Sequence, residues 1–496
     1  MFVKNVFDPV EQKAMDEWRA RSEALSGWLG DIPDIDHPYP VRFRTAEMEI
    51  IRHQAFAADF KNLLYRDEAY AKKSKWGGII AHPFFCKVVA HSCPFHFYAM
   101  PPSVARCERA TLSEGLRLFE PIRPGDTFRV WIAPATIEDV TDEPGEQPCR
   151  KIRTYEYVNY YNQNDKLVAT VYRDNTNSYT DPNADFSKIL KCGYEWSAAM
   201  GGDEHLGEVR KSKEFVYTPE QIAAIDKVYA NETRRGNVAR YWEGVEPGET
   251  LPVVVHGPIT VWDSFTAIAA FGGVPMPMME IRTRTPFEVL VDPNTNIPHK
   301  SIEGHFAGSA LDGTKWYSHT VIENFIYYFC GRLASNWMGD DGYITHLLWS
   351  KMNNTHLGDT VFGRGRVLRK YIDGLGRCVV DIDTGMQSNR GFFTNSCPVT
   401  VELPSITKMT KGVLPEAPEQ KEIDLNPEGL KVGDHVKVKD WPDWELPGGY
   451  PLADQPGVIC DMHNVDGYCF VLMDNDVTGH DPRVPVGFRF TDIEKI

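Results

Sequence analysis

The sequence predicts an α+β protein of two similar units, each a curled antiparallel sheet around one long helix, followed by a small β-barrel. Three observations predict this. A Gly-Asp-Thr turn that opens a block of strands occurs twice, at 125–127 and 358–360. A helical pattern precedes each block. After residue 431, short apolar runs alternate with Gly and Pro turns, which is typical of a small barrel.

Each Gly-Asp-Thr turn leads into an alternating strand, a second strand that ends in a polar hairpin turn, and a final strand. We expect the two hairpin turns around 163–165 and 387–389. The first block is longer by the segment EPGEQPCR, which lengthens one hairpin without disturbing the sheet. The two blocks therefore read as copies of one plan.

The helical patterns are expected at roughly 68–91 in the first unit and 319–337 in the second. The second, HTVIENFIYYFCGRLASNW, is apolar on nearly every side, so this helix should be buried all round.

The same patterns place the domain boundaries. Between the units lies a polar connector with a helical pattern at 218–231, and after the second unit comes a Pro/Glu-rich linker. The expected division is 1–180 for the first unit, 181–250 for the connector, 251–410 for the second unit, 411–430 for the linker, and 431–496 for a β-barrel of the SH3 type.

Composition limits the classes of function. The 53 basic and 69 acidic side chains give a net charge of −16, which argues against nucleic acid or an anionic membrane as a partner. No run reaches the roughly 18 uncharged apolar residues of a membrane helix, and the first residues do not resemble a signal peptide. The ten cysteines lack paired spacing, so we expect reduced thiols, a cytoplasmic location and no metal site.

Four stretches carry a family resemblance: NLLYRDEAYAKKSKWGGIIAHPFF, FEPIRPGDTF, RRGNVARYWEGVEPGETLPVVVHGPIT and NWMGDDG. The sequence resembles the MaoC-like acyl-CoA dehydratases, also called (R)-specific enoyl-CoA hydratases, in their double-hotdog form. The resemblance spans roughly residues 45–405 and leaves the barrel without a family role. It implies a double-hotdog fold, an acyl-CoA thioester as the bound partner, and addition or removal of water across the α,β double bond. It implies no cofactor beyond the CoA of the substrate, and we also expect a homo-oligomer.

This chemistry needs an acid/base group near the reacting carbons and N–H donors for the thioester oxygen, where negative charge develops. The N-terminus of a central helix can supply such donors.

The family's catalytic signature, Asp-x-Asn-Pro-Leu-His, is altered in the first unit. Asn62 matches, Tyr65 stands at the His position, and Phe60 stands at the strict Asp position. Asp59 can serve as the acid/base carboxylate if one residue bulges. The alternative is that this stretch only caps the start of a helix.

In the second unit, His305 has the spacing before Trp337 at which the resemblance places a catalytic histidine. Lys300 stands where the signature has Asp, so Glu303, Asp312 or Asp59 would have to replace that carboxylate. The alternative is a surface-loop histidine without a role.

Substrate contacts are expected at Asn62, at His82, which replaces a proline usual in the family, and at three arginines of the connector, Arg234, Arg235 and Arg240. Arginine suits the phosphates of CoA. The alternatives are that His82 caps a helix and that the arginines pair with the chain's own carboxylates.

Two other functions stay open at this point. The altered signature is also consistent with a hotdog acyl-CoA thioesterase, because one fold hosts several chemistries. A non-catalytic acyl-CoA-binding subunit of a hydratase complex is the third interpretation.

Overall fold

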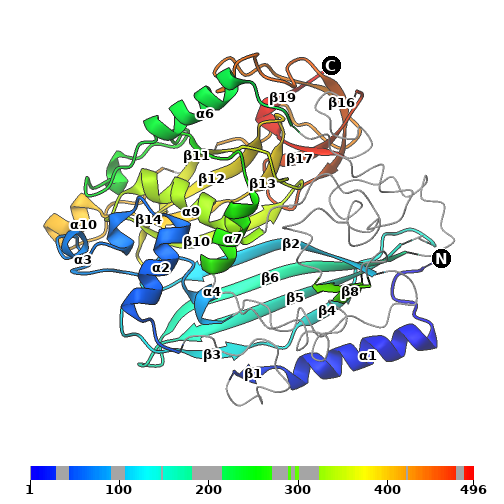
Figure 1. Ribbon diagram of the computed structural model, residues 1–496, viewed down its shortest axis with the longest axis horizontal. Coiled ribbons are helices and arrows are strands. Elements are labelled where there is room, and N and C mark those ends of the chain that lie inside the picture. Colours follow the sequence, from blue (N-terminus) through cyan, green and yellow to red (C-terminus); the bar gives the residue numbers. More distant parts are fainter. Residues whose placement is uncertain are drawn as a thin grey trace.

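The computed structural model describes residues 2–29, 44–90, 107–146, 149–180, 215–270, 289–291, 296–300, 323–419, 423–475 and 485–496. In this part of the chain, two sheet-and-helix units stand side by side, and a group of short strands packs against the second unit (Figure 1).

The first unit is an antiparallel sheet in the order β2–β6–β5–β3, with β4 also on β5 and β1 on β3. The strands β5 and β6 form a long hairpin through the turn predicted at 163–165. The strand bounds are β1 Gly27–Trp28, β2 Cys107–Leu118, β3 Arg129–Ile132, β4 Thr136–Asp139, β5 Cys149–Tyr161 and β6 Leu167–Thr180.

The second unit repeats this plan in the order β10–β14–β12–β11–β7, with β13 beside β10 and β12. The bounds are β7 Val254–His256, β10 Tyr343–Lys351, β11 Val361–Ile372, β12 Cys378–Ser388, β13 Phe393–Ser396 and β14 Val399–Glu402. A separate small hairpin joins β8 Val289–Val291 to β9 Pro298–Lys300.

The two units share one sheet, because β2 of the first pairs with β10 of the second. The pairing is antiparallel and runs from His346 opposite Arg117 to Ser350 opposite Ser113. Residues of both units form one continuous apolar core between the sheet and the helices. The predicted pair of similar antiparallel sheet units is thereby confirmed.

The helices of the two units contribute residues to the common apolar core beside the sheet. Their bounds are α2 Met48–Ala58, the 3-10 helix η1 Leu63–Tyr65, α3 Glu68–Ala71, α4 Cys86–Val89, α7 Val261–Ala270 and α9 Glu323–Met338. The connector contributes α6 Pro219–Asn231 and the 3-10 helix η4 Trp242–Gly244, and α10 Ile406–Lys411 follows β14.

The second predicted helix is confirmed as α9, and its side chains from Tyr328 to Met338 are buried except for the half-buried Arg332. The first prediction, one helix over 68–91, is wrong. Only the short α3 and α4 form there, because the chain turns at Gly77, whose φ is +68°, and Pro83 has no amide hydrogen for a continuous helix. Residues 91–106 and 301–322 lie outside the described residues.

After the linker, five short strands pair in the order β19–β15–β16–β17–β18 around their own apolar core. They are β15 His435–Val438, β16 Pro456–Met462, β17 Tyr468–Met473, β18 Val486–Arg489 and, after the 3-10 helix η8 Phe490–Asp492, β19 Ile493–Lys495. The SH3-type barrel predicted here stays a prediction beyond this strand order.

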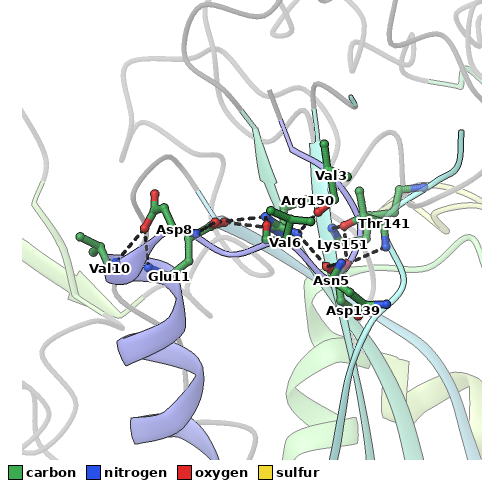
Figure 2. A network of polar contacts seen from close by, with 10 residues as sticks. All are labelled: Val3, Asn5, Val6, Asp8, Val10, Glu11, Asp139, Thr141, Arg150 and Lys151. Carbon is green, nitrogen blue, oxygen red and sulfur yellow. Dashed lines mark hydrogen bonds and ion pairs between the residues drawn. The ribbon is translucent and has the colours of Figure 1, made fainter. Parts of the chain in front are cut away.

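An element that the sequence pattern did not predict, α1 Pro9–Ala24, runs along the edge of the first unit (Figure 1). The segment before it is fixed by Arg150 of β5, which is 2% exposed (Figure 2). The guanidinium donates to the Val3 and Val6 carbonyls and to the Glu11 and Asp139 carboxylates. One arginine thus joins the segment 2–11 to the sheet.

Among the described helices, none combines the length and apolar character that crossing a membrane requires.

Candidate active site

The candidate site lies where α2 ends, and its residues come from η1, the segment before α4, the connector and the C-terminal half of α9. The first unit supplies Asp59, Asn62, Tyr65 and His82, as the signature predicted for the first three. The connector and α9 supply the residues that hold them.

Asp59 is the last residue of the α2 turn, where its backbone N–H donates to the Ala55 carbonyl at 2.9 Å. Its side chain is buried and paired with Arg234, whose Nη1 and Nη2 donate to the two carboxylate oxygens at 3.1 and 2.5 Å. The Ser335 hydroxyl of α9 donates to the same carboxylate at 3.3 Å. The two-point ion pair offsets the cost of burying the carboxylate charge.

His82 is 2% exposed and lies among three aromatic rings. The rings of Tyr65, Phe84 and Tyr328 have centroids 5.3, 5.3 and 5.6 Å from its imidazole. Burial lowers the pKa of His82 to about 4, and the charges of Asp59 and Arg234 act on it in opposite directions. The imidazole is therefore neutral at pH 7.

The tautomer of His82 follows from one contact. The backbone N–H of Phe84 donates to Nδ1 at 3.3 Å, which places the imidazole proton on Nε2. Among the described residues, the structure gives Nε2 no hydrogen-bond partner. His82 thus combines the cap predicted as its alternative role with one N–H that can serve a ligand.

Tyr65 and Asn62 have different environments. Burial, with the negative charge of Asp59 next, raises the pKa of Tyr65, so its phenol stays protonated and cannot act as a base near neutral pH. The side-chain oxygen of Asn62 accepts from the Leu64 backbone N–H at 3.2 Å, which caps η1.

The three arginines of the connector do not converge on one surface. Arg234 is bound to Asp59, and Arg240 donates to Glu249 at 2.5 Å while it stacks over Trp337 at 4.3 Å. Among the described residues, Arg235 donates to backbone carbonyls of its own loop, those of Val238 and Ala239.

Two partners of the site were missed from the sequence. Ser335 donates to Asp59, as described above. Asp340 accepts from the Tyr70 hydroxyl at 2.5 Å, and burial raises its pKa. Asp340 belongs to NWMGDDG, and its backbone N–H donates to the Gly236 carbonyl of RRGNVARYWEGVEPGE. These two sequence motifs contact each other, and their contact places Arg234 beside Asp59. Their joint presence could therefore have predicted this part of the site.

The second-unit prediction falls on residues that the structure leaves out. His305, Glu303 and Asp312 lie outside the described residues, as does the side chain of Lys300. In the rest of the chain, no group of three or more His, Cys, Asp or Glu side chains is arranged to hold a metal ion.

Comparison with known families gives one match. Residues 40–171 match the model of a FAS1-like dehydratase domain region. This segment contains Asp59, Asn62, Tyr65 and His82, and the match agrees with the dehydratase resemblance predicted from the sequence. The match supports a protein of the hydratase or dehydratase type. No curated protein sequence matches the chain significantly.

Three solved structures are similar over most of their length. A MaoC-like dehydratase is 14% identical, with a TM-score of 0.45 over 74% of this chain and 98% of that chain. A MaoC-domain dehydratase from Chloroflexus aurantiacus is 14% identical, with a TM-score of 0.41 over 73% and 93%. A conserved protein from Mycobacterium tuberculosis, described as a double hotdog, is 12% identical, with a TM-score of 0.39 over 76% and 98%. Likenesses of this size carry no conclusion about activity.

Proposed function

On the premise that residues 40–171 form a dehydratase domain region, we propose that the chain adds or removes water across the α,β double bond of an acyl-CoA thioester. The observation that carries the proposal is the buried pair of a carboxylate, Asp59, and a neutral imidazole, His82, within that region. Acid/base chemistry of this kind needs a carboxylate and a hydrogen-bond donor in a site from which water is excluded.

In the proposed hydration, Asp59 takes a proton from water as the water oxygen bonds to the β-carbon. The same carboxyl group then gives a proton to the α-carbon, so that one water is added in total. Arg234 and Ser335 are positioning residues that hold the carboxylate in place. The Nε2–H of His82 donates to the thioester oxygen, where negative charge develops. This sequence of steps uses no metal or redox cofactor.

The remaining expectations enter as proposals. Tyr65 acts as a hydrogen-bond donor in the proposed site, since its raised pKa keeps the proton on the phenol. His305 stays the predicted acid/base group of the second unit. Arg235 is the connector arginine without a carboxylate partner among the described contacts, so it is the one proposed to meet a CoA phosphate. A homo-oligomer and a cytoplasmic location also remain predictions.

The test is the loss of enoyl-thioester absorbance when purified protein is mixed with a panel of enoyl-CoA thioesters. We expect D59N and H82Q to lower kcat/KM about a hundredfold or more, because each removes a group that acts on the reacting atoms. The matched control is H346Q. Burial also lowers the pKa of His346 to about 4, but His346 lies on the other side of the sheet against Tyr172, and its loss should leave the rate unchanged.

The pH profile tests the same assignment. Because the pKa of His82 is about 4, the imidazole stays neutral above about pH 5.5, and activity should not change through the range in which an ordinary histidine titrates. Activity should fall as the pH approaches 4, because protonated Nδ1 can no longer accept from the Phe84 N–H that orients the imidazole. No response to any enoyl-CoA would overturn the proposal, and release of free thiol from a saturated acyl-CoA would replace it with a thioesterase.

A further inference from the structure

Gln54 lies in the middle of α2 with its side chain 1% exposed. Neither the amide nitrogen nor the amide oxygen has a hydrogen-bond partner in the structure as described. An amide buried in this way destabilises the fold, since both groups have lost water and gained nothing. Buried polar groups without a partner are rare in native proteins, so a functional role can explain why this one is retained.

Ser264 of α7 repeats this pattern. Its side chain is fully buried, and its hydroxyl also lacks a partner among the described residues. A serine within a helix can donate to a carbonyl of the preceding turn, but the structure shows no such bond for Ser264. Its hydroxyl therefore remains available to another group.

The two side chains lie on helix faces that meet. The helices α2 and α7 pack against each other, and both contact α9 (Figure 1). Since α7 packs on α2 and α9, its buried face is the face that meets them. The buried positions are Ile51, Gln54, Ala55 and Ala58 on α2 and, among the described side chains of α7, Ser264 and Ala267.

These buried faces have a defined relation to the site. Gln54 lies four residues, or about 6 Å along the helix axis, before Ala58, the last residue of α2, and Asp59 follows directly. In the proposed site, an acyl chain that continues from the double bond along α2 would reach these buried positions. The buried positions of both faces carry no charged side chain, so they do not favour a carboxylate or an ammonium group.

We propose that Gln54 and Ser264 recognise an uncharged hydroxyl group on the acyl chain of the substrate. A hydroxyl can accept from the amide nitrogen of Gln54 and donate to its amide oxygen or to the serine oxygen. This inference rests on the proposed function. It states that Gln54 and Ser264 make the protein prefer acyl thioesters with a hydroxyl group over those with a plain hydrocarbon chain. The bound substrate then supplies the hydrogen bonds that the buried amide of Gln54 lacks.

The experiment compares a straight-chain 2-enoyl-CoA with the same thioester carrying a hydroxyl on its acyl chain. For Q54M, which keeps the length of the side chain and removes the amide, we expect kcat/KM for the hydroxylated substrate to fall about tenfold relative to the plain one. S264A should shift the preference in the same direction by a smaller factor. Q54M should also raise the Tm by about 1–4 °C, because an unsatisfied amide is gone.

The matched control is T355V. Thr355 has a buried hydroxyl without a partner among the described residues, in a loop after β10, and T355V should leave the substrate preference unchanged. Wild-type turnover with the same preference in Q54M would overturn this inference alone. Absence of turnover of either thioester by the wild type would overturn it together with the proposed function.

Discussion

The two Gly-Asp-Thr turns have the same backbone but differ in the side chains that close them. In the first unit, one exposed residue closes the turn: Gln163 donates to Asp126 at 2.8 Å and accepts from the Thr127 N–H at 3.0 Å. In the second unit, two buried residues share this task. Asn389 accepts from the Thr360 N–H at 3.0 Å, and Arg390 donates to Asp359 at 3.0 Å.

The rest of the turn is conserved between the units. Asp126 accepts from the backbone N–H of Arg123, and Asp359 accepts from that of His356, each three residues earlier. The glycines at 125 and 358 have φ of +91° and +89°. The duplication therefore preserves the local turn, while its closing partners follow the environment.

The connector causes the difference in burial. Tyr217 donates to the Gly358 carbonyl at 2.9 Å and lies 2.8 Å from the Thr360 hydroxyl oxygen, and Phe215 lies under the Arg390 guanidinium. Once this cover excludes water, the aspartate of the turn needs a cation, whereas the half-buried aspartate of the first unit can use water and an amide. The ion pair between Asp359 and Arg390 is therefore a consequence of burial and not of the turn conformation.

The largest expected difference between the two turns comes from replacing the aspartate of each turn by asparagine. D359N removes the carboxylate charge opposite the buried Arg390, and we expect it to lower the free energy of unfolding by about 3–5 kcal/mol. D126N should cost about 1 kcal/mol or less, since its hydrogen bond with Gln163 is exposed. Denaturant unfolding of both variants measures the difference. Equal losses would show that the turn, and not its burial, sets the cost.

The outer faces of the two units give a second comparison. The terminal strands cover the second unit, where the Tyr468 hydroxyl donates to the buried Asp383 at 2.7 Å. On the first unit, the Tyr172 hydroxyl lies 2.7 Å from the ring nitrogen of His346 beside the exposed Tyr157.

Because its partner is a buried carboxylate, we expect Y468F to destabilise the fold by about 1.5–3 kcal/mol. Y172F should cost about 0.5–1.5 kcal/mol, as for an ordinary neutral hydrogen bond. Thermal or denaturant unfolding can rank the pair, and a larger loss in Y172F would contradict the idea that the terminal strands set the difference.

The smallest expected effect concerns the two amides that close the turns. N389A leaves the backbone N–H of Thr360 without its acceptor in a buried place, at a cost of about 1–2 kcal/mol. Q163A exposes the equivalent N–H of Thr127 to water, so its effect should stay within about 0.5 kcal/mol. Amide hydrogen exchange at these two N–H groups provides an independent readout, with faster exchange expected in both variants.

Local patterns predicted the parts of the fold that local sequence determines. The duplicated turns, the β5–β6 hairpin, α6 and α9 follow from turn residues and helical periodicity. The second hairpin turn was expected at 387–389; Asn389 of this range closes the Gly-Asp-Thr turn, while Gln387 still lies in β12 and donates to the Gly391 carbonyl. Which of Gln387 and Asn389 closes the turn depends on the register of the hairpin, and tertiary contacts set that register.

The candidate site was less predictable because its contacts span the chain. Asp59 and its partner Arg234 are 175 residues apart, and Ser335 is 276 residues from Asp59. The signature identified Asp59 and the acidity of the chain suggested ion-paired arginines, but neither pattern shows which arginine reaches which carboxylate. The buried amide of Gln54 has no sequence signal, since a helix pattern reveals a face and not the satisfaction of its polar groups.

The contacts of Arg150 with the segment 2–11 join a part of the chain that is synthesised early to a strand that is synthesised later. The segment 2–11 leaves the ribosome long before residue 150, yet its carbonyls and carboxylate bind a guanidinium on β5, beside Asp139 on β4. These contacts cannot form until about 140 further residues have been synthesised. The segment 2–11 is thus synthesised before the arginine that holds it against the sheet.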